Sequence, residues 1–162
     1  MGQMSPGEVF DTLADGPIHW FRDWPHASVP SFGAGIYTIW DNDGRFIYVA
    51  MSGRGTTRGT AVRKQSHGLV TRLRRHARGK RSGDQFCVYV ADRFVLSALS
   101  AEEIAGIASG RHSLDVYIRQ YIHKYLGYRY SLCGDGVEAS VIERQIRRGG
   151  WRSGKPLLNS LP

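Results

Sequence analysis

The sequence predicts an α/β chain of the α+β kind, with a small, mainly antiparallel sheet flanked by helices. Two strand-like runs enclose a turn signal at 41–44, and apolar residues recur at helical spacing over 65–78 and 114–126. Capping signals at 100–103 and 135–138 indicate two further helices. Tight turns join antiparallel strands, and amphipathic helices must bury one face against another element. With 162 residues and 41% hydrophobic residues, the chain is sized for one domain with a core.

The first 33 residues are predicted to be an N-terminal extension to a domain over 34–162. Trp20, Phe21 and Trp24 are apolar enough to cover part of the core. Pro25 and Pro30 oppose a long helix in this segment, because proline disrupts a helix interior.

The next elements are predicted to form an antiparallel hairpin. Residues 34–40 and 45–51 are rich in the β-branched and aromatic residues that favour strands. The turn Asp41-Asn42-Asp43-Gly44 lies between them. Residues 52–60 are rich in Gly, Ser and Thr, which predicts a loop.

A helix is predicted from about Gln65 to Arg78, closed by Gly79. Leu69, Val70, Leu73 and Ala77 share one face at helical spacing. Arg72 and His76 lie at the border of this apolar stripe, whereas Arg74, Arg75 and Arg78 point away from it. The sequence therefore predicts one Arg–His pair beside the core and an outward basic face.

The remaining elements follow from the same signals. Residues 85–90 are predicted to be a strand, 100–110 a short capped helix, and 114–126 an amphipathic core helix. Residues 128–133 are predicted to be a strand and 136–148 a helix that ends at Gly149-Gly150, followed by an irregular tail over 151–162.

The net charge of +8 favours a polyanionic partner, and its distribution strengthens that expectation. From Arg45 to Gly83 there are eleven Lys or Arg and no Asp or Glu. The alternative is a merely solvated basic surface, but no i,i+4 acid partner is present in this stretch. The candidate nucleic-acid contacts are Arg54, Arg58, Arg63, Lys64, Arg74, Arg75, Arg78, Lys80 and Arg81.

Several classes of protein are disfavoured. No apolar run of about 18 residues is present, so no transmembrane segment or membrane partner is expected. No secretory signal is visible, and Cys87 and Cys133 form no CxxC pair, which fits a cytoplasmic protein with reduced thiols. The histidines show no zinc spacing, and residues 150–155 fall short of a P-loop. The oligomeric state stays open, with a homodimer as one of the states considered.

Short motifs with catalytic side chains occur in a recurrent order. They are Gly35-Ile36-Tyr37, Tyr48-Val49-Ala50, Arg72 with His76 one turn later, Glu143 in a helix, and Lys155-Pro156-Leu157-Leu158-Asn159. In this order they resemble the GIY-YIG nuclease superfamily over roughly residues 34–159. Each motif alone is weak, but five in order are fairly specific.

The resemblance implies a GIY-YIG-like fold and a divalent-metal-dependent DNA endonuclease that uses Mg²⁺ or Mn²⁺. Phosphodiester hydrolysis needs an activated water, a phosphate clamp and a cation for developing charge. By the resemblance, Tyr37 would be the general base or would position the water, with Tyr48 as its partner. Arg72 would bind the scissile phosphate, and His76 would support a phenol or a phosphate oxygen. Glu143 would hold the metal, and Asn159 would brace the site.

Each assignment has a simpler alternative. Strand tyrosines commonly pack in a core, His76 could be a surface helix residue, and Asn159 could be a turn residue. Glu138 competes with Glu143 as the metal ligand, but a capping box with Asp135 explains Glu138.

Ala50 replaces the family's glycine and would cost about 1 kcal/mol if that position needed a positive φ. A lapsed nuclease that binds DNA or RNA is therefore the alternative function. A third reading is an RNA or ribosome-associated binder that uses the basic stretch alone.

Overall fold

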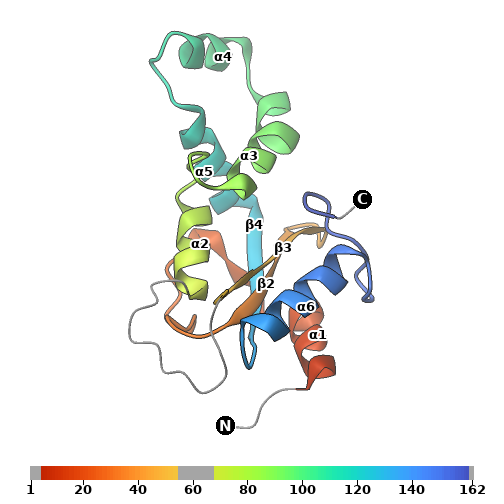
Figure 1. Cartoon of the computed structure of the whole chain (residues 1–162). Helices are drawn as coiled ribbons and strands as arrows, with labels where there is room; N and C mark the ends of the chain where they lie inside the picture. Colours follow the sequence, from red (N-terminus) through yellow and green to blue (C-terminus); the bar gives the residue numbers. More distant parts are fainter. Residues whose placement is uncertain (1–4, 55–67, 161–162) are drawn as a thin grey trace.

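The described strands form one antiparallel sheet with helices on both faces, which confirms the predicted α+β class (Figure 1). The structure is a computed structural model and describes residues 5–54 and 68–160. The strand order is β1-β4-β2-β3, so β2 is central and β3 lies at an edge. The strands are β1 (His19–Trp20), β2 (Gly35–Asp41), β3 (Phe46–Ser52) and β4 (Leu126–Leu132).

The helices alternate with loops and short irregular turns along the chain. The α-helices are α1 (Pro6–Asp15), α2 (Leu69–Ala77), α3 (Gln85–Val90), α4 (Ala101–Ala108), α5 (Leu114–Tyr125) and α6 (Gly136–Arg147). The shorter helical turns are η1 (Phe21–Asp23), η2 (Ala91–Val95) and η3 (Leu96–Ala98). Among the described residues, no helix is long and apolar enough to cross a lipid bilayer.

The hairpin of β2 and β3 forms as predicted and is held by its turn residues. The carboxylate of Asp41 accepts hydrogen bonds from the backbone N–H groups of Asp43 and Arg45 at 3.0 and 2.8 Å. Gly44 completes the turn with a φ of +79°, a conformation that favours glycine. This local network sets the register that places Tyr37 opposite Ala50.

Both faces of the hairpin are buried, and the alternation of side chains divides the core into two clusters. Tyr37, Ile39 and Tyr48 face the cluster that contains α2, α3 and α5. Ile36 and Val49 face the opposite cluster with α1 and α6. The two motif tyrosines therefore lie on the sheet face that α2 covers.

Residues 85–90 form the helix α3, so the predicted strand in this segment is wrong. The side chain of Asp84 accepts a hydrogen bond from the N–H of Phe86 at 3.2 Å and caps the helix. Phe86, Cys87 and Val90 are buried in the α2-side cluster. Short apolar runs fit a buried strand or a buried helix equally well, and here the cap favours the helix.

The N-terminal segment contributes to the domain core. Ser5 and Glu8 form a capping box that begins α1, and Val9 and Leu13 of α1 are buried in the α6-side cluster. β1 pairs with β4, which extends the sheet, and Phe21 is fully buried. The expectation that aromatic residues near position 20 cover part of the core is confirmed for Phe21 and Trp24, whereas Trp20 is in neither core cluster. The helix α1 was not foreseen.

Candidate active site

Three buried polar residues from separate elements form one hydrogen-bonded chain. The hydroxyl of Tyr37 in β2 lies 2.6 Å from Nε2 of His76 in α2. Nδ1 of the same imidazole lies 2.7 Å from Oδ2 of Asp84, the cap of α3. Tyr37 is fully buried, and His76 is 1% exposed. The histidine predicted at the border of the apolar stripe is therefore inside the core.

The protonation states follow from burial and from these bonds. Burial lowers the pKa of His76, although the hydrogen bond and charge of Asp84 oppose this effect. Burial also acts to raise the pKa of Asp84, but hydrogen bonds from His76 and from Cys87 outweigh it and leave that pKa lowered. We therefore assign a neutral imidazole whose Nδ1–H donates to an ionised Asp84, so that Nε2 accepts the proton of Tyr37.

Tyr48 lies beside the same imidazole on the neighbouring strand. Its ring meets that of His76 edge to face at a centroid distance of 5.9 Å, and it packs against Phe86 at 4.9 Å. Burial raises the pKa of Tyr48 to about 12, and burial raises that of Tyr37 well above 10. Both phenols are thus neutral at physiological pH unless a partner removes the proton.

Arg72, one helical turn before His76 in α2, interacts with the two phenols. The interaction with Tyr37 is the largest cause that raises the pKa of Arg72, and the positive charge of Arg72 opposes the rise that burial causes in the pKa of both tyrosines. Its Nε atom is buried and has no hydrogen-bond partner among the described residues. A buried guanidinium N–H without a partner is expected to have a ligand in the working state.

Glu143 reaches the same electrostatic environment from α6, which packs against β3. Burial raises the pKa of Glu143, and the charges of Arg147, Arg54 and Arg72 oppose that rise. Charge on Glu143 also raises the pKa of Tyr48. The carboxylate therefore lies within electrostatic range of two other predicted site residues, on a helix that belongs to the other side of the sheet.

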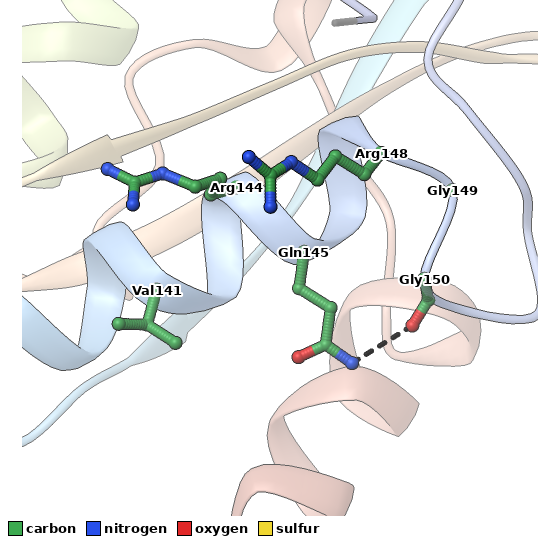
Figure 2. A pocket seen from close by; sticks show the side chains of 6 residues that line it. All are labelled: Val141, Arg144, Gln145, Arg148, Gly149 and Gly150. Atoms are coloured by element: carbon green, nitrogen blue, oxygen red, sulfur yellow. Dashed lines mark hydrogen bonds between the residues drawn. The ribbon is translucent and has the colours of Figure 1, made fainter.

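The outward side of α6 is basic beyond Glu143. Figure 2 shows Arg144 and Arg148 projecting from the same side of the helix, above a cavity of about 450 Å³. Gln145 also lines this cavity and donates a 3.0 Å hydrogen bond to the carbonyl of Gly150. The charge of Arg144 also opposes the rise that burial causes in the pKa of Glu143, so this carboxylate lies within a cationic field.

Asn159 lies along β3 and hydrogen-bonds to its backbone. Its side-chain oxygen accepts a 3.2 Å hydrogen bond from the N–H of Val49, and its amide nitrogen donates to the carbonyl of Val49. Leu157 and Leu158 donate backbone hydrogen bonds to the carbonyls of Phe46 and Ile47. The C-terminal tail thus covers the edge strand up to the residue after Tyr48.

Two small residues of the motifs, Gly35 in the first and Ala50 in the second, have different structural surroundings. A Cβ on Gly35 would lie 2.8 Å from Cδ1 of Leu69 and 3.0 Å from the carbonyl of Ser131, so close packing favours glycine at this position. Ala50 lies within β3, and no described non-glycine residue has a positive φ. Ala50 therefore carries none of the backbone strain that the sequence alone left open.

The predicted nucleic-acid contacts divide into three groups. Arg54, Arg74, Arg75, Arg78 and Lys80 are exposed. Arg81 is also exposed, but its guanidinium pairs with Asp115 at 2.7 Å, and Arg45 pairs with Asp41 at 2.6 Å, so the expectation that the cations of this stretch lack acid partners is wrong for these two residues. Arg58, Arg63 and Lys64 lie outside the described residues.

A divalent cation would depend on Glu143 for its protein ligand. The described residues contain no group of three or more His, Cys, Asp and Glu side chains that could hold a metal. Magnesium commonly uses one or two carboxylates together with water and phosphate oxygens. One carboxylate near the guanidinium of Arg72 fits that donor set if a phosphate supplies the remaining oxygens.

Sequence reasoning missed Asp84. The sequence signal was an Asp directly before an apolar run, which is a common helix cap, but the strand interpretation of 85–90 hid it.

Comparison of the chain with protein-family models, with curated proteins and with solved structures gave no match.

Proposed function

We propose that this protein is a divalent-metal-dependent DNA endonuclease of the GIY-YIG type. The observation that carries the proposal is the convergence of the motif residues. Tyr37 bonds to His76 at 2.6 Å, Tyr48 lies edge to face with the same imidazole, and α6, which carries Glu143, packs against the strand of Tyr48. These residues are far apart in the chain, so their meeting around one hairpin is not a consequence of local sequence.

The side chains suggest a division of labour. As the water oxygen forms a bond to phosphorus and the bond to the leaving oxygen breaks, Tyr37 takes the proton of the water. Tyr37 passes its own proton to Nε2 of His76, which is the acceptor in the assigned tautomer. Arg72 clamps the phosphate through the guanidinium whose Nε has no partner among the described residues. Asn159 holds β3, and hence Tyr48, in place.

The proposed cofactor is Mg²⁺ or Mn²⁺, held by Glu143. When bound, such an ion neutralises charge that develops on phosphate oxygens. The surrounding arginines make the site cationic without DNA, so we propose that DNA phosphates and metal bind together. DNA is the proposed partner, on the strength of the exposed arginines of α2, and the cytoplasm is the proposed location.

A second candidate function is nucleic-acid binding without cleavage, to DNA or RNA. It is favoured by the complete burial of Tyr37, because a phenol without exposed surface cannot contact a water or a phosphate unless its surroundings rearrange. The strain at Ala50 that first suggested this alternative is absent.

The test is incubation with supercoiled, linear and single-stranded DNA, with Mg²⁺, with Mn²⁺ and with a chelator. The proposal expects nicked or linear products only when metal is present. Binding in the chelator without products under either metal would refute the endonuclease and support the binding protein.

A further inference from the structure

We infer that Asp84 is a positioning residue that sets the tautomer of His76 and so makes Nε2 the proton acceptor for Tyr37. The catalytic part of this inference rests on the proposed endonuclease. The structural part concerns which imidazole nitrogen carries the proton, and it can be tested without any cleavage.

The two carboxylate oxygens of Asp84 have different partners. Oδ1 accepts the N–H of Phe86 at 3.2 Å, which is the capping bond of α3. Oδ2 lies 2.7 Å from Nδ1 of His76, and the thiol of Cys87 also donates to it at 3.4 Å. The cap fixes how the carboxylate is turned, and an ionised carboxylate only accepts, so Nδ1 must carry the hydrogen.

This arrangement predicts the effect of Asp84→Asn. The asparagine oxygen must stay at the Oδ1 position, because the N–H of Phe86 needs an acceptor. The amide NH₂ then faces Nδ1 of His76, which becomes the acceptor, and the hydrogen moves to Nε2. Nε2 can then no longer accept the proton of Tyr37, as in other catalytic histidines whose orienting carboxylate is replaced by an amide.

The test compares Asp84→Asn with Asp135→Asn. Asp135 caps α6 by accepting the N–H of Glu138 at 2.8 Å, so the control makes the same chemical change at a helix cap away from His76. Asparagine caps helices about as well as aspartate. Nitrogen-15 NMR reads the protonated ring nitrogen of His76, and a His76→Gln spectrum identifies its resonances.

We expect the Nδ1–H form in the wild type and in Asp135→Asn, and the Nε2–H form in Asp84→Asn. Cleavage should fall by roughly 10²–10⁴-fold in Asp84→Asn, the range that general acid–base catalysis supplies, and remain unchanged in the control. An Nε2–H form in the wild type would overturn the inference. This measurement uses the wild type alone, so it holds even if a variant fails to fold. The inference also fails if Asp84→Asn switches the tautomer yet cleaves at the wild-type rate.

Failure of the proposed function gives a different pattern. A wild type that shows the Nδ1–H form but never cleaves DNA refutes the endonuclease and leaves the tautomer assignment standing.

A second inference rests on an independent observation. We propose that a cavity of about 420 Å³ between α2, η1 and α5 binds a backbone phosphate of duplex DNA that is not the one being cut. Its lining includes Trp24, Arg74, Arg78, Lys80, Arg119 and His123. These side chains carry four formal positive charges, and no carboxylate lines the cavity.

The cations are concentrated by the close packing of α2 on α5. Gly79, with a φ of +68°, lets the chain after α2 approach α5 so closely that a Cβ there would lie 2.6 Å from the backbone of Arg119. His123 donates from Nε2 to the carbonyl of Ala77 at 2.8 Å, which ties the two helices together. In Figure 1, α2 and α5 lie next to each other on one side of the molecule.

The cavity has no internal source of negative charge. Asp115, one turn before Arg119 on α5, is engaged by Arg81 at 2.7 Å. Among the described residues, no ion pair involves Arg74, Arg78, Lys80 or Arg119. The carbonyl groups at the end of α2 carry a partial negative charge, which offsets only a fraction of one of these positive charges. Like charges held this close repel one another until an anion arrives.

The position on α2 separates this cavity from the candidate active site. Arg72 and His76 form one i,i+4 pair near the sheet, and Arg74 and Arg78 form another, turned by about 200° around the helix. The bound phosphate therefore lies across α2 from the two phenols, and the contact supplies affinity without base recognition.

The test uses Arg119→Ala, Arg119→Lys and the control Arg111→Ala, with a short DNA duplex in chelator. Arg111 lies in the segment between α4 and α5. In Figure 1, α4 lies at the far end of the molecule from the sheet. Removal of one phosphate contact should lower the log–log salt slope by about one, so that raising salt from about 50 to about 200 mM weakens the wild type roughly 3.5-fold more than Arg119→Ala.

Arg119→Lys should keep the wild-type slope, because it keeps the charge, and Arg111→Ala should bind as the wild type does. Wild-type affinity and slope in Arg119→Ala would overturn the inference. If the wild type does not cleave DNA but Arg119→Ala lowers the salt slope as expected, only the endonuclease is refuted.

Discussion

The hydroxyl of Tyr37 lies 2.6 Å from Nε2 of His76, although 39 residues separate them in the chain. The bond joins the central strand to α2 inside the core. Burial raises the pKa of this phenol, and the bond places an acceptor for its proton beside it. The same bond would also stabilise a purely structural core, so variants must separate the two roles.

Tyr37→Phe should reduce cleavage by roughly 10²–10⁴-fold and leave DNA affinity unchanged, because it removes the proton carrier and keeps the ring. The free energy of unfolding should fall by about 1–3 kcal/mol, because Nε2 of His76 loses its buried donor. Tyr130→Phe is the control, since its hydroxyl bonds the carbonyl of Ser28 in an exposed position. Wild-type cleavage in Tyr37→Phe would show that this tyrosine is structural.

Glu143→Gln should abolish metal-dependent cleavage and tighten DNA binding in chelator. It removes the negative charge that Arg147, Arg54 and Arg72 surround, so the phosphates meet a more cationic surface. Glu138→Gln is the comparison, because Glu138 accepts the N–H of Gly134 at 2.6 Å near the start of α6. It should cost up to about 1 kcal/mol of stability and keep cleavage. A cleaving Glu143→Gln beside an inactive Glu138→Gln would reverse the metal assignment.

Asn159→Ala should lower the free energy of unfolding by about 1–3 kcal/mol, since Val49 loses the partners of both its N–H and its carbonyl. Asn159→Asp should cost at least as much, because a carboxylate cannot donate to that carbonyl. Chemical denaturation measures both, and Ser160→Ala at an exposed neighbouring position is the control. If both Asn159 variants are as stable as the wild type, Asn159 does not brace β3.

Stability should fall as pH drops below about 6.5, through the burial of His76. The pKa of His76 is lowered in the folded protein from its ordinary 6.5, so between the two values the unfolded chain binds more protons. The slope from one histidine is at most about 1.4 kcal/mol per pH unit.

His19 contributes in the same direction, because burial and the charge of His26 lower its pKa. Denaturation of His19→Gln at several pH values should therefore show a reduced slope that is still positive. An NMR titration midpoint of His76 above 6.5 would contradict the assigned neutral imidazole.

Ala50→Gly should destabilise the protein by about 0.5–1 kcal/mol and should not raise cleavage. Ala50 is a buried strand residue without a positive φ, so glycine adds unfolded-state freedom and relieves no strain. Gly35→Ala is the contrasting variant, because its Cβ would collide with Leu69 and the carbonyl of Ser131. A more stable and more active Ala50→Gly would show that this position does need glycine.

The sequence by itself determined the elements whose signals lie between near neighbours. The hairpin turn depends on Asp41, which bonds N–H groups two and four residues later. The Ser100–Glu103 capping box and the apolar stripe of α5 are equally local, and both formed as predicted. Such features need only short-range geometry, so their residues can be recognised without knowledge of the fold.

Only the tertiary structure decided which residues meet across the chain. Asp84 caps α3 through a local bond to Phe86, but only the packing of α2 and α3 into one core brings its other carboxylate oxygen to His76. Asn159 pairs with Val49 across 110 residues, and Arg81 pairs with Asp115 across 34. No local pattern encodes these partners, because they are chosen by the packing of whole elements on the two faces of one sheet.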